Sequence, residues 1–356
     1  MKPLAGVRIV EFDGLGPVTL AGMMLADLGA EVLRLTRADQ ASAFGDVGGA
    51  VLHRGRTAVP VDLKSPEDRT TVLDLVARAD AVIEGFRPGV LERLGLGPED
   101  CQARNPRLVF GRVTGWGQTG PLASTVGHDI NYIALTGALH AMGEPDRPPR
   151  PPLNLVGDYG GGAMMLVTGV LAGVIEARRT GLGRVVDAAM TDGTSLLSSL
   201  FHALGASGLW SAERGTNLLD GGAPFYRCYA CADGGFVAVG ALEPRFYAAL
   251  LAGLGIDPVE APQFPPSGWP ALHLRFERAF AERSRGEWED RFRGTEACVT
   301  PVLSFEEAAG HPHNLARQTL SGDPVQPAPA PRFDGVVGNP APATVIDLKA
   351  ASALWA

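Results

Sequence analysis

Apolar and polar residues in the first two hundred positions alternate between short β-rich runs and longer runs with helical spacing. The predicted strands cover residues 7–12, 31–35, 59–63, 81–84, 107–113 and 184–189. The predicted helices cover residues 19–29, 66–79, two short segments before 107, a segment from about 127, 160–178 and 192–204. Strands that alternate with helices are typical of a parallel sheet with helical layers. The pattern therefore predicts an α/β fold, Rossmann-like in outline.

The pattern changes after about Glu213, where a Gly-rich and aromatic region begins. It is followed by a predicted strand at 236–239, a helix at 244–254 and two charged helices at 272–282 and 286–293. We expect a large domain at 1–205, and a linker with a smaller α+β domain at 206–324. A proline-rich segment that starts at Asp323 is expected to run extended, so that residues 325–356 rejoin the large domain.

Charge and cysteine content narrow the function classes. A net charge of -8 argues against nucleic-acid binding, which needs a basic surface. Four cysteines do not make a disulfide framework, and the N-terminus lacks the sequence pattern of a signal peptide, so we expect a cytoplasmic protein.

The Cys228/Cys231 pair has no second pair with which to hold zinc, so no metal is expected. The apolar run at 159–175 is short for a membrane span and is interpreted as a buried helix.

Two features bear on phosphate binding: the first argues against a dinucleotide site, and the second leaves a phosphate site open. The first glycine cluster, Asp13-Gly-Leu-Gly-Pro17, follows a strand, but Thr19 stands where a dinucleotide-binding fingerprint needs its third glycine. Several cations come near strand ends, where parallel sheets bind ligands, although arginines in loops are usually solvated. These cations are Arg37, Arg54, Arg56, Lys64 and Arg87.

Polar residues at three predicted helix starts are candidates for acid/base chemistry. His128 and Asp129 stand where a loop enters a helix, and backbone N–H groups there favour anions. Asp158 precedes three glycines, so it is either a helix cap or a group beside a closely approaching substrate oxygen. Glu243 is ambiguous in the same way between a cap and a supporting acid.

Taken together, these stretches resemble the α-methylacyl-CoA racemases, a branch of the family III CoA-transferase superfamily. The resemblance runs nearly end to end and is carried by several segments together. They include Glu84-Gly-Phe-Arg-Pro-Gly-Val90, Thr114-Gly-Trp-Gly-Gln-Thr-Gly-Pro121, Gly127-His-Asp-Ile-Asn-Tyr132 and Asp220-Gly-Gly-Ala-Pro-Phe-Tyr226.

The resemblance implies an enzyme that interconverts (R)- and (S)-2-methylacyl-CoA thioesters by proton transfer through an enolate. It implies that His128 and Asp158 are the two acid/base residues, that Glu243 holds the histidine, and that Asp129 is a supporting carboxylate. No cofactor is implied, because CoA is part of the substrate. An interlocked homodimer is implied. The implied contacts to the CoA portion are Arg37, Arg54, Arg56, Gly85, Phe86, Arg87, Arg93, Gly127 and Tyr132.

Two other functions remain open at this point. A CoA transferase of the same fold would use Asp158 as a nucleophile that forms an acyl-aspartyl anhydride. His128 with Asp129 favours the racemase, because the transferase does not need that pair. A CoA-binding protein without catalysis would not need the set of His128, Asp158 and Glu243.

Overall fold

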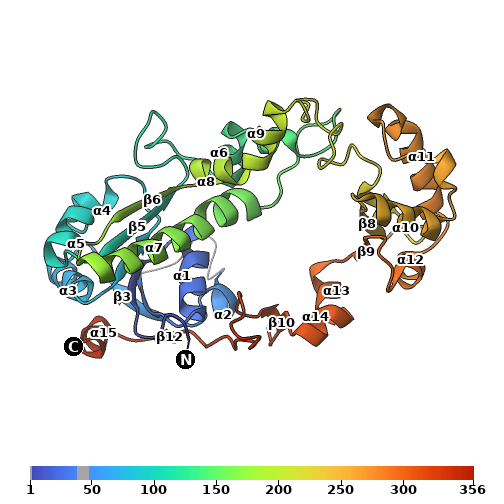
Figure 1. The fold of residues 1–356 in the computed structure, drawn as a ribbon. Helices are drawn as coiled ribbons and strands as arrows, with labels where there is room; N and C mark the ends of the chain where they lie inside the picture. Colours follow the sequence, from blue (N-terminus) through green and yellow to red (C-terminus); the bar gives the residue numbers. More distant parts are fainter. Residues whose placement is uncertain (1, 38–47) are drawn as a thin grey trace. The chain divides into compact units, whose positions relative to one another are not determined.

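The computed structural model describes residues 2–37 and 48–356, and this part of the chain forms two compact units (Figure 1). Unit 1 comprises residues 1–138, 152–199 and 316–356, and unit 2 comprises residues 139–151 and 200–315. The sequence placed the boundary at 205, inside a helix, and did not separate residues 139–151 from the large domain.

Unit 1 is built on a seven-stranded sheet of order β12-β3-β2-β1-β4-β5-β6, in which every neighbouring pair is parallel. The predicted α/β class is therefore confirmed. The strands are β1 (Arg8–Phe12), β2 (Glu31–Arg37), β3 (Thr57–Val61), β4 (Ala81–Glu84), β5 (Val109–Thr114), β6 (Val185–Ala189) and β12 (Thr344–Val345). The strand order reverses beside β1, since β2 lies on one side of it and β4 on the other.

Helices cover both faces of this sheet, because successive strand residues point to opposite faces. Ile9 packs into the core beneath α1 and α7, whereas its neighbour Val10 packs into the core beneath α3, α5 and α15. The helices of unit 1 are α1 (Pro17–Asp27), α2 (Gly49–Leu52), α3 (Pro66–Val76), α4 (Val90–Arg93), α5 (Pro98–Arg104), α6 (Asp129–Leu135), α7 (Met164–Thr180), α8 (Met190–Leu197) and α15 (Leu348–Leu354). A π-helix, Leu155–Ala163, leads into α7, and α9 (Ser199–Ala206) crosses into unit 2.

The helix ends follow local chemistry. The Ser65 hydroxyl accepts the Asp68 N–H at 3.3 Å, and Pro66 occupies the first turn of α3. At the other end of a helix, Gly181 terminates α7 with a φ of 77°, a left-handed conformation that glycine adopts without strain.

Among the described residues, one helical segment, Leu155–Thr180, is long and apolar enough to cross a membrane by length and composition. The core helix of a soluble protein meets the same test. Half of its most apolar window is buried inside the protein. Leu166 and Val170 pack there against the sheet, as the sequence predicted for a core helix.

Unit 2 contains an antiparallel sheet of order β7-β8-β9, formed by Tyr226–Ala230, Phe236–Gly240 and Val299–Val302. Of these strands the sequence predicted only β8. An aromatic core fills the space between the sheet and three helices, and within it Tyr229 stacks on Phe280 with ring centroids 4.9 Å apart. The helices of unit 2 are α10 (Pro244–Leu254), α11 (Trp269–Phe280), α12 (Arg285–Phe292), α13 (Phe305–Gly310) and α14 (Pro312–Arg317), which ends in unit 1. Helix α10 has the predicted bounds.

The C-terminal segment belongs to unit 1. After a small hairpin of β10 (Leu320–Ser321) and β11 (Gln326–Pro327), it supplies β12 on the edge of the sheet and α15 against α3. Trp355 is buried, and its indole N–H donates to Glu31 Oε2 at 3.1 Å. These contacts explain why a proline-rich stretch can end in ordered structure.

Candidate functional site

The candidate site of unit 1 lies at the carboxyl ends of the parallel strands. The loop after β1 contains Gly14 and Gly16, the loop after β4 contains residues 85–89, and the loop after β5 begins at Gly115. Open parallel sheets bind ligands at this edge, where the strand order reverses. Most of the predicted site residues come from these loops, from helix α6 and from the π-helix at Leu155–Ala163.

His128 is the residue that precedes α6, and its backbone is extended. Its N–H donates to Asn131 Oδ1 at 3.0 Å, so the asparagine closes the first turn of the helix. The imidazole is exposed, whereas the neighbouring Asp129 is buried. The predicted helix start is confirmed, and its imidazole is accessible to a ligand.

Asp129 links α6 to the segment that carries Asp158. Its Oδ1 accepts the backbone N–H of Asp158 at 2.6 Å. Its Oδ2 is buried and has no hydrogen-bond partner among the described residues. A Cβ at position 157 would lie 2.5 Å from Asp129 Oδ1, so only glycine allows this close approach. The predicted supporting carboxylate thus holds the Asp158 backbone directly.

Asp158 lies in the first turn of the π-helix, so it does not cap the long helix, which was one of the two roles that the sequence left open. Single π-helical turns are frequent at functional sites. The Asp158 Oδ2 accepts a hydrogen bond from Asn154 Nδ2 at 3.3 Å. A Cβ on Gly16 would lie 3.2 Å from the same oxygen, so the glycine loop after β1 borders the carboxyl group. Neither Asn154 nor Gly16 was predicted as a site residue, although Gly16 belongs to the glycine cluster noted in the sequence.

The pKa of Asp158 is raised above its ordinary value. Partial burial is the largest cause, and the negative charge of Asp129 adds to it, while the Asn154 hydrogen bond and the His128 charge oppose it. A carboxyl group with a raised pKa can serve as an acid as well as a base near neutral pH. His128 and Asp158 are therefore close enough to influence each other electrostatically.

The three glycines after Asp158 have a packing role, and the predicted approach of a substrate oxygen stays a prediction. A Cβ on Gly161 would lie 2.6 Å from Thr194 Oγ1 of α8, and one on Gly193 of α8 would lie 2.0 Å from the Gly161 oxygen. A Cβ on Gly162 would lie 3.0 Å from Pro17 of α1. These glycines let the π-helix pack against α1 and α8.

Tyr132 connects the Asp158 region to the loop after β4. Its hydroxyl donates to the Gly127 carbonyl, and its ring meets Trp116 edge-on with centroids 4.8 Å apart. Its pKa is raised by burial and by the charge of Asp158, and the positive charge of Arg87 lowers it. Tyr132, Asp158 and Arg87 thus lie within electrostatic reach of one another.

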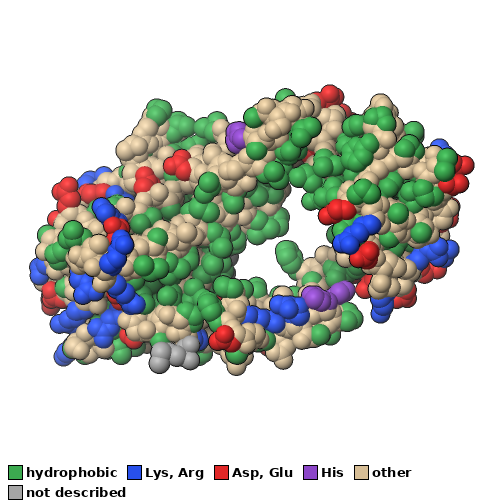
Figure 2. Space-filling model, in the orientation of Figure 1, with side chains coloured by type: hydrophobic (Ala, Val, Ile, Leu, Met, Phe, Trp, Pro, Cys, Tyr) green, Lys and Arg blue, Asp and Glu red, His purple; other side chains and the backbone are tan. Residues whose placement is uncertain are grey.

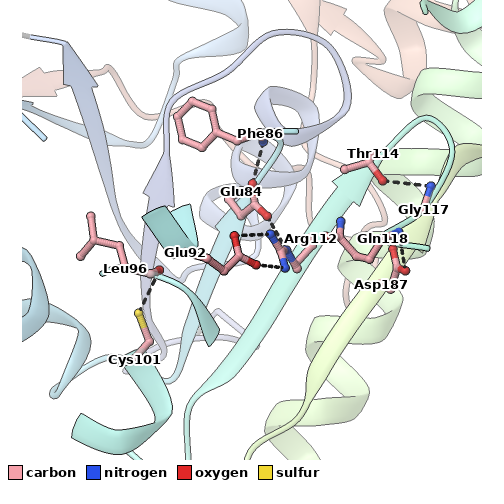
Figure 3. Close-up of polar contacts among 10 residues, drawn as sticks. All are labelled: Glu84, Phe86, Glu92, Leu96, Cys101, Arg112, Thr114, Gly117, Gln118 and Asp187. Carbon is pink, nitrogen blue, oxygen red and sulfur yellow. Dashed lines mark hydrogen bonds and ion pairs between the residues drawn. The ribbon is translucent and has the colours of Figure 1, made fainter. Parts of the chain in front are cut away.

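The loop of residues 85–89 is held from below by buried charges (Figure 3). The Phe86 N–H donates to Glu84 Oε2 at 2.6 Å, and the Phe86 ring meets Phe12 edge-on at 6.3 Å. Arg87 and Gly85 are exposed, so both can contact a ligand. Arg93, at the end of α4, is also exposed and lies beside Gly89.

Arg54 and Arg56 are not placed to bind a nucleotide. Arg54 is 2% exposed and pairs with Asp27 at 2.6 Å, while donating to Gln326 and Pro327 of the C-terminal segment. Arg56 is 1% exposed and pairs with Glu11 at 2.5 Å. Both guanidinium groups are buried and paired with carboxylates. Arg54 and Arg56 are therefore not kept as predicted contacts to the CoA phosphates.

Two predicted residues are described by their own elements alone. Arg37 ends β2 with an exposed side chain. Glu243 belongs to unit 2, where it is the exposed residue that precedes α10 and makes no side-chain cap. Its contact with His128 stays a prediction.

Comparison with known proteins assigns the chain to a family. Residues 4–342 match CoA-transferase family III. The chain is 46% identical over 332 residues to an α-methylacyl-CoA racemase of Mus musculus and 44% identical to one of Homo sapiens, in each case over 92% of this chain and 86% of the relative. The crystal structure of a CAIB/BAIF family protein from Brucella suis superposes with a TM-score of 0.81 and 25% identity, covering 99% of this chain and 98% of that one. The resemblance seen in the sequence is confirmed, and the chain belongs to CoA-transferase family III.

Proposed function

We propose that this protein is a racemase that interconverts (R)- and (S)-2-methylacyl-CoA thioesters. The observation that carries the proposal is the Asp158 carboxyl group, with its raised pKa, held by Asp129 beside His128 at the carboxyl edge of the sheet. The names of the mouse and human relatives support the same substrate class.

The proposed chemistry needs one base and one acid on opposite faces of the α-carbon. In one direction His128 takes the α-proton, an enolate forms, and protonated Asp158 returns a proton to the other face. In the reverse direction the carboxylate takes the proton and the imidazolium returns one. The raised pKa of Asp158 suits this exchange, because it brings the carboxyl closer to imidazole in acidity. We expect no cofactor to be needed.

The proposed contacts to the CoA portion are the exposed arginines at the sheet edge and the loop after β4. Arg87 and Arg93 offer cations beside the exposed backbone of Gly85, and Arg37 offers a third at the end of β2. Guanidinium groups bind phosphate oxygens in pairs of parallel hydrogen bonds. Arg54 and Arg56 are left out of this set.

We also propose the finer features that the sequence suggested: a Rossmann-like unit 1, an interlocked homodimer and a cytoplasmic location. The order of β3 to β6 around β1 supports the first. Apolar side chains gather over α7 in Figure 2, and exposed ones in unit 1 include Leu135, Leu153, Leu155, Met164, Leu196 and Leu197. Large exposed apolar surfaces mark association sites, so light scattering of the active protein should give the mass of a dimer.

The deciding experiment is incubation of a single 2-methylacyl-CoA epimer in heavy water without added cofactor. The proposal predicts a near-equal mixture of epimers with deuterium at the α-carbon. NMR measures both the epimer ratio and the deuterium content. Transfer of CoA to an added carboxylic acid, with release of the free 2-methyl acid and without α-exchange, would instead establish the transferase. In that reaction Asp158 attacks the thioester carbonyl, and CoA leaves as the thiolate that is passed to the second acid.

A further inference from the structure

A single guanidinium group ties together both ends of the loop at residues 85–89. At the start of the loop, Glu84 Oε2 accepts the Phe86 N–H at 2.6 Å, and Glu84 Oε1 accepts from Arg112 Nε at 2.7 Å. At the end of the loop, two further nitrogens of Arg112 donate to the two carboxylate oxygens of Glu92, at 2.7 and 3.3 Å. Figure 3 shows the three side chains converging under the loop.

The fold sets this arrangement with little freedom. Glu84 ends β4 and lies directly opposite Arg112 in the register with β5. Glu84 is fully buried, Arg112 is 5% exposed, and Glu92 reaches the guanidinium from α4. A buried ion is costly unless it is paired and hydrogen-bonded, so these groups are held in one geometry. Only arginine has a planar fork that can bridge two carboxylates at once.

The loop that this cluster holds carries Arg87, whose side chain is exposed. The charge of Arg87 acts on the Tyr132 hydroxyl, which the charge of Asp158 also influences. Displacing either end of so short a loop would move Arg87 and the exposed backbone of Gly85 together. Arg112 itself is buried, so we assign it no direct contact with a ligand.

We propose that Arg112 is a positioning residue for recognition of the CoA portion of the substrate, acting through Glu84 and Glu92 on the loop that presents Arg87. The proposal rests on the proposed function, because it assumes that this loop binds the CoA thioester. It assigns Arg112 no part in moving the α-proton.

The test uses Arg112→Lys in the full-length enzyme, because lysine keeps the charge and cannot bridge both carboxylates. We expect KM for a 2-methylacyl-CoA to rise about tenfold or more, because moving a positioned group by about 1 Å can have effects of this size. The kcat should change little. In an Arg87→Ala background, the same substitution should change KM by less than about twofold, because interacting residues are not additive.

Two further variants keep the test decisive. Glu92→Gln removes the charge at the more exposed end of the cluster, where folding is at less risk, and should also raise KM. Arg184→Lys is the matched control: Arg184 makes a comparable two-point pair with Glu176 at 3.0 and 2.7 Å, at the amino end of β6. It should leave KM and kcat within about twofold of the parent.

An Arg112→Lys effect on KM that is equally large without Arg87, or that appears only as a loss of kcat, would overturn the proposal. So would an unchanged KM in Glu92→Gln if Arg112→Lys does not fold. Calorimetric titration with a CoA thioester separates this outcome from failure of the proposed function. If the parent does not bind the thioester, the proposed function fails; if the parent and the variants bind it equally, the positioning role fails.

Discussion

Gly157 is the position at which a single methyl group tests the site geometry most directly. In Gly157→Ala, the new Cβ would lie 2.5 Å from Asp129 Oδ1 and 2.9 Å from Ile133 Cγ2. Ordinary van der Waals contact begins at 3.4 Å, so the segment must move by roughly 1 Å. Asp158 is the next residue, and its N–H is the group bonded to Asp129, so the displacement reaches the proposed acid/base group directly.

The magnitude follows from this displacement. Overpacking of a buried contact costs about 1–3 kcal/mol of unfolding free energy, and a catalytic group displaced by about 1 Å can cost about 10²-fold in rate. We therefore expect Gly157→Ala to lose about 10²-fold in kcat for α-deuterium exchange while KM for the CoA thioester changes little. The three atoms nearest to the added Cβ belong to Asp129 and Ile133, and none belongs to the loop at residues 85–89.

The assay pairs exchange kinetics by NMR with thermal unfolding. Gly205→Ala is the control, because nothing lies within 4 Å of its added Cβ and the residue is in helix α9. Alanine there should leave the rate unchanged and raise stability slightly. Full exchange activity in Gly157→Ala, with an unchanged unfolding midpoint, would show that the contact between residue 157 and Asp129 is not as close as described.

Two further predictions address the division of labour at the site. Asp158→Ala should abolish epimerisation but still exchange deuterium into one epimer through His128, and His128→Ala should do so into the other epimer; full racemisation by either variant, measured on separated epimers, would contradict the assignment. Asp129→Asn removes a charge that raises the pKa of Asp158 while leaving an oxygen to accept the Asp158 N–H. In the direction where Asp158 is the base, activity falls as pH drops through its pKa, so that limb of the pH–rate profile should move to lower pH. A limb that stays in place or moves up would show that the Asp129 charge has no such effect.

The sequence alone determined the features that depend on neighbouring residues. Apolar runs bounded by turn residues predicted β1, β4 and the bounds of α10. The polar residues around His128 predicted a helix start, and together the motifs indicated the family. Strand β7 was not predicted, because its residues show no clear alternation of polar and apolar positions. Its strand conformation depends on pairing with β8.

Only the tertiary structure decided which charged side chains are free to bind a ligand. Arg54 and Arg56 look like loop cations in the sequence, but their partners Asp27 and Glu11 lie 27 and 45 residues away and bury them. Conversely, Arg112 lies within an apolar strand, and its link to Glu84 and Glu92 exists only once β4, β5 and α4 are packed together. Asp158 looks like a helix cap until the glycines after it pack against α8 and α1 in a π-helix. In each case the deciding partner is distant along the chain, and the free energy of burying a charge depends on partners that local patterns do not reveal.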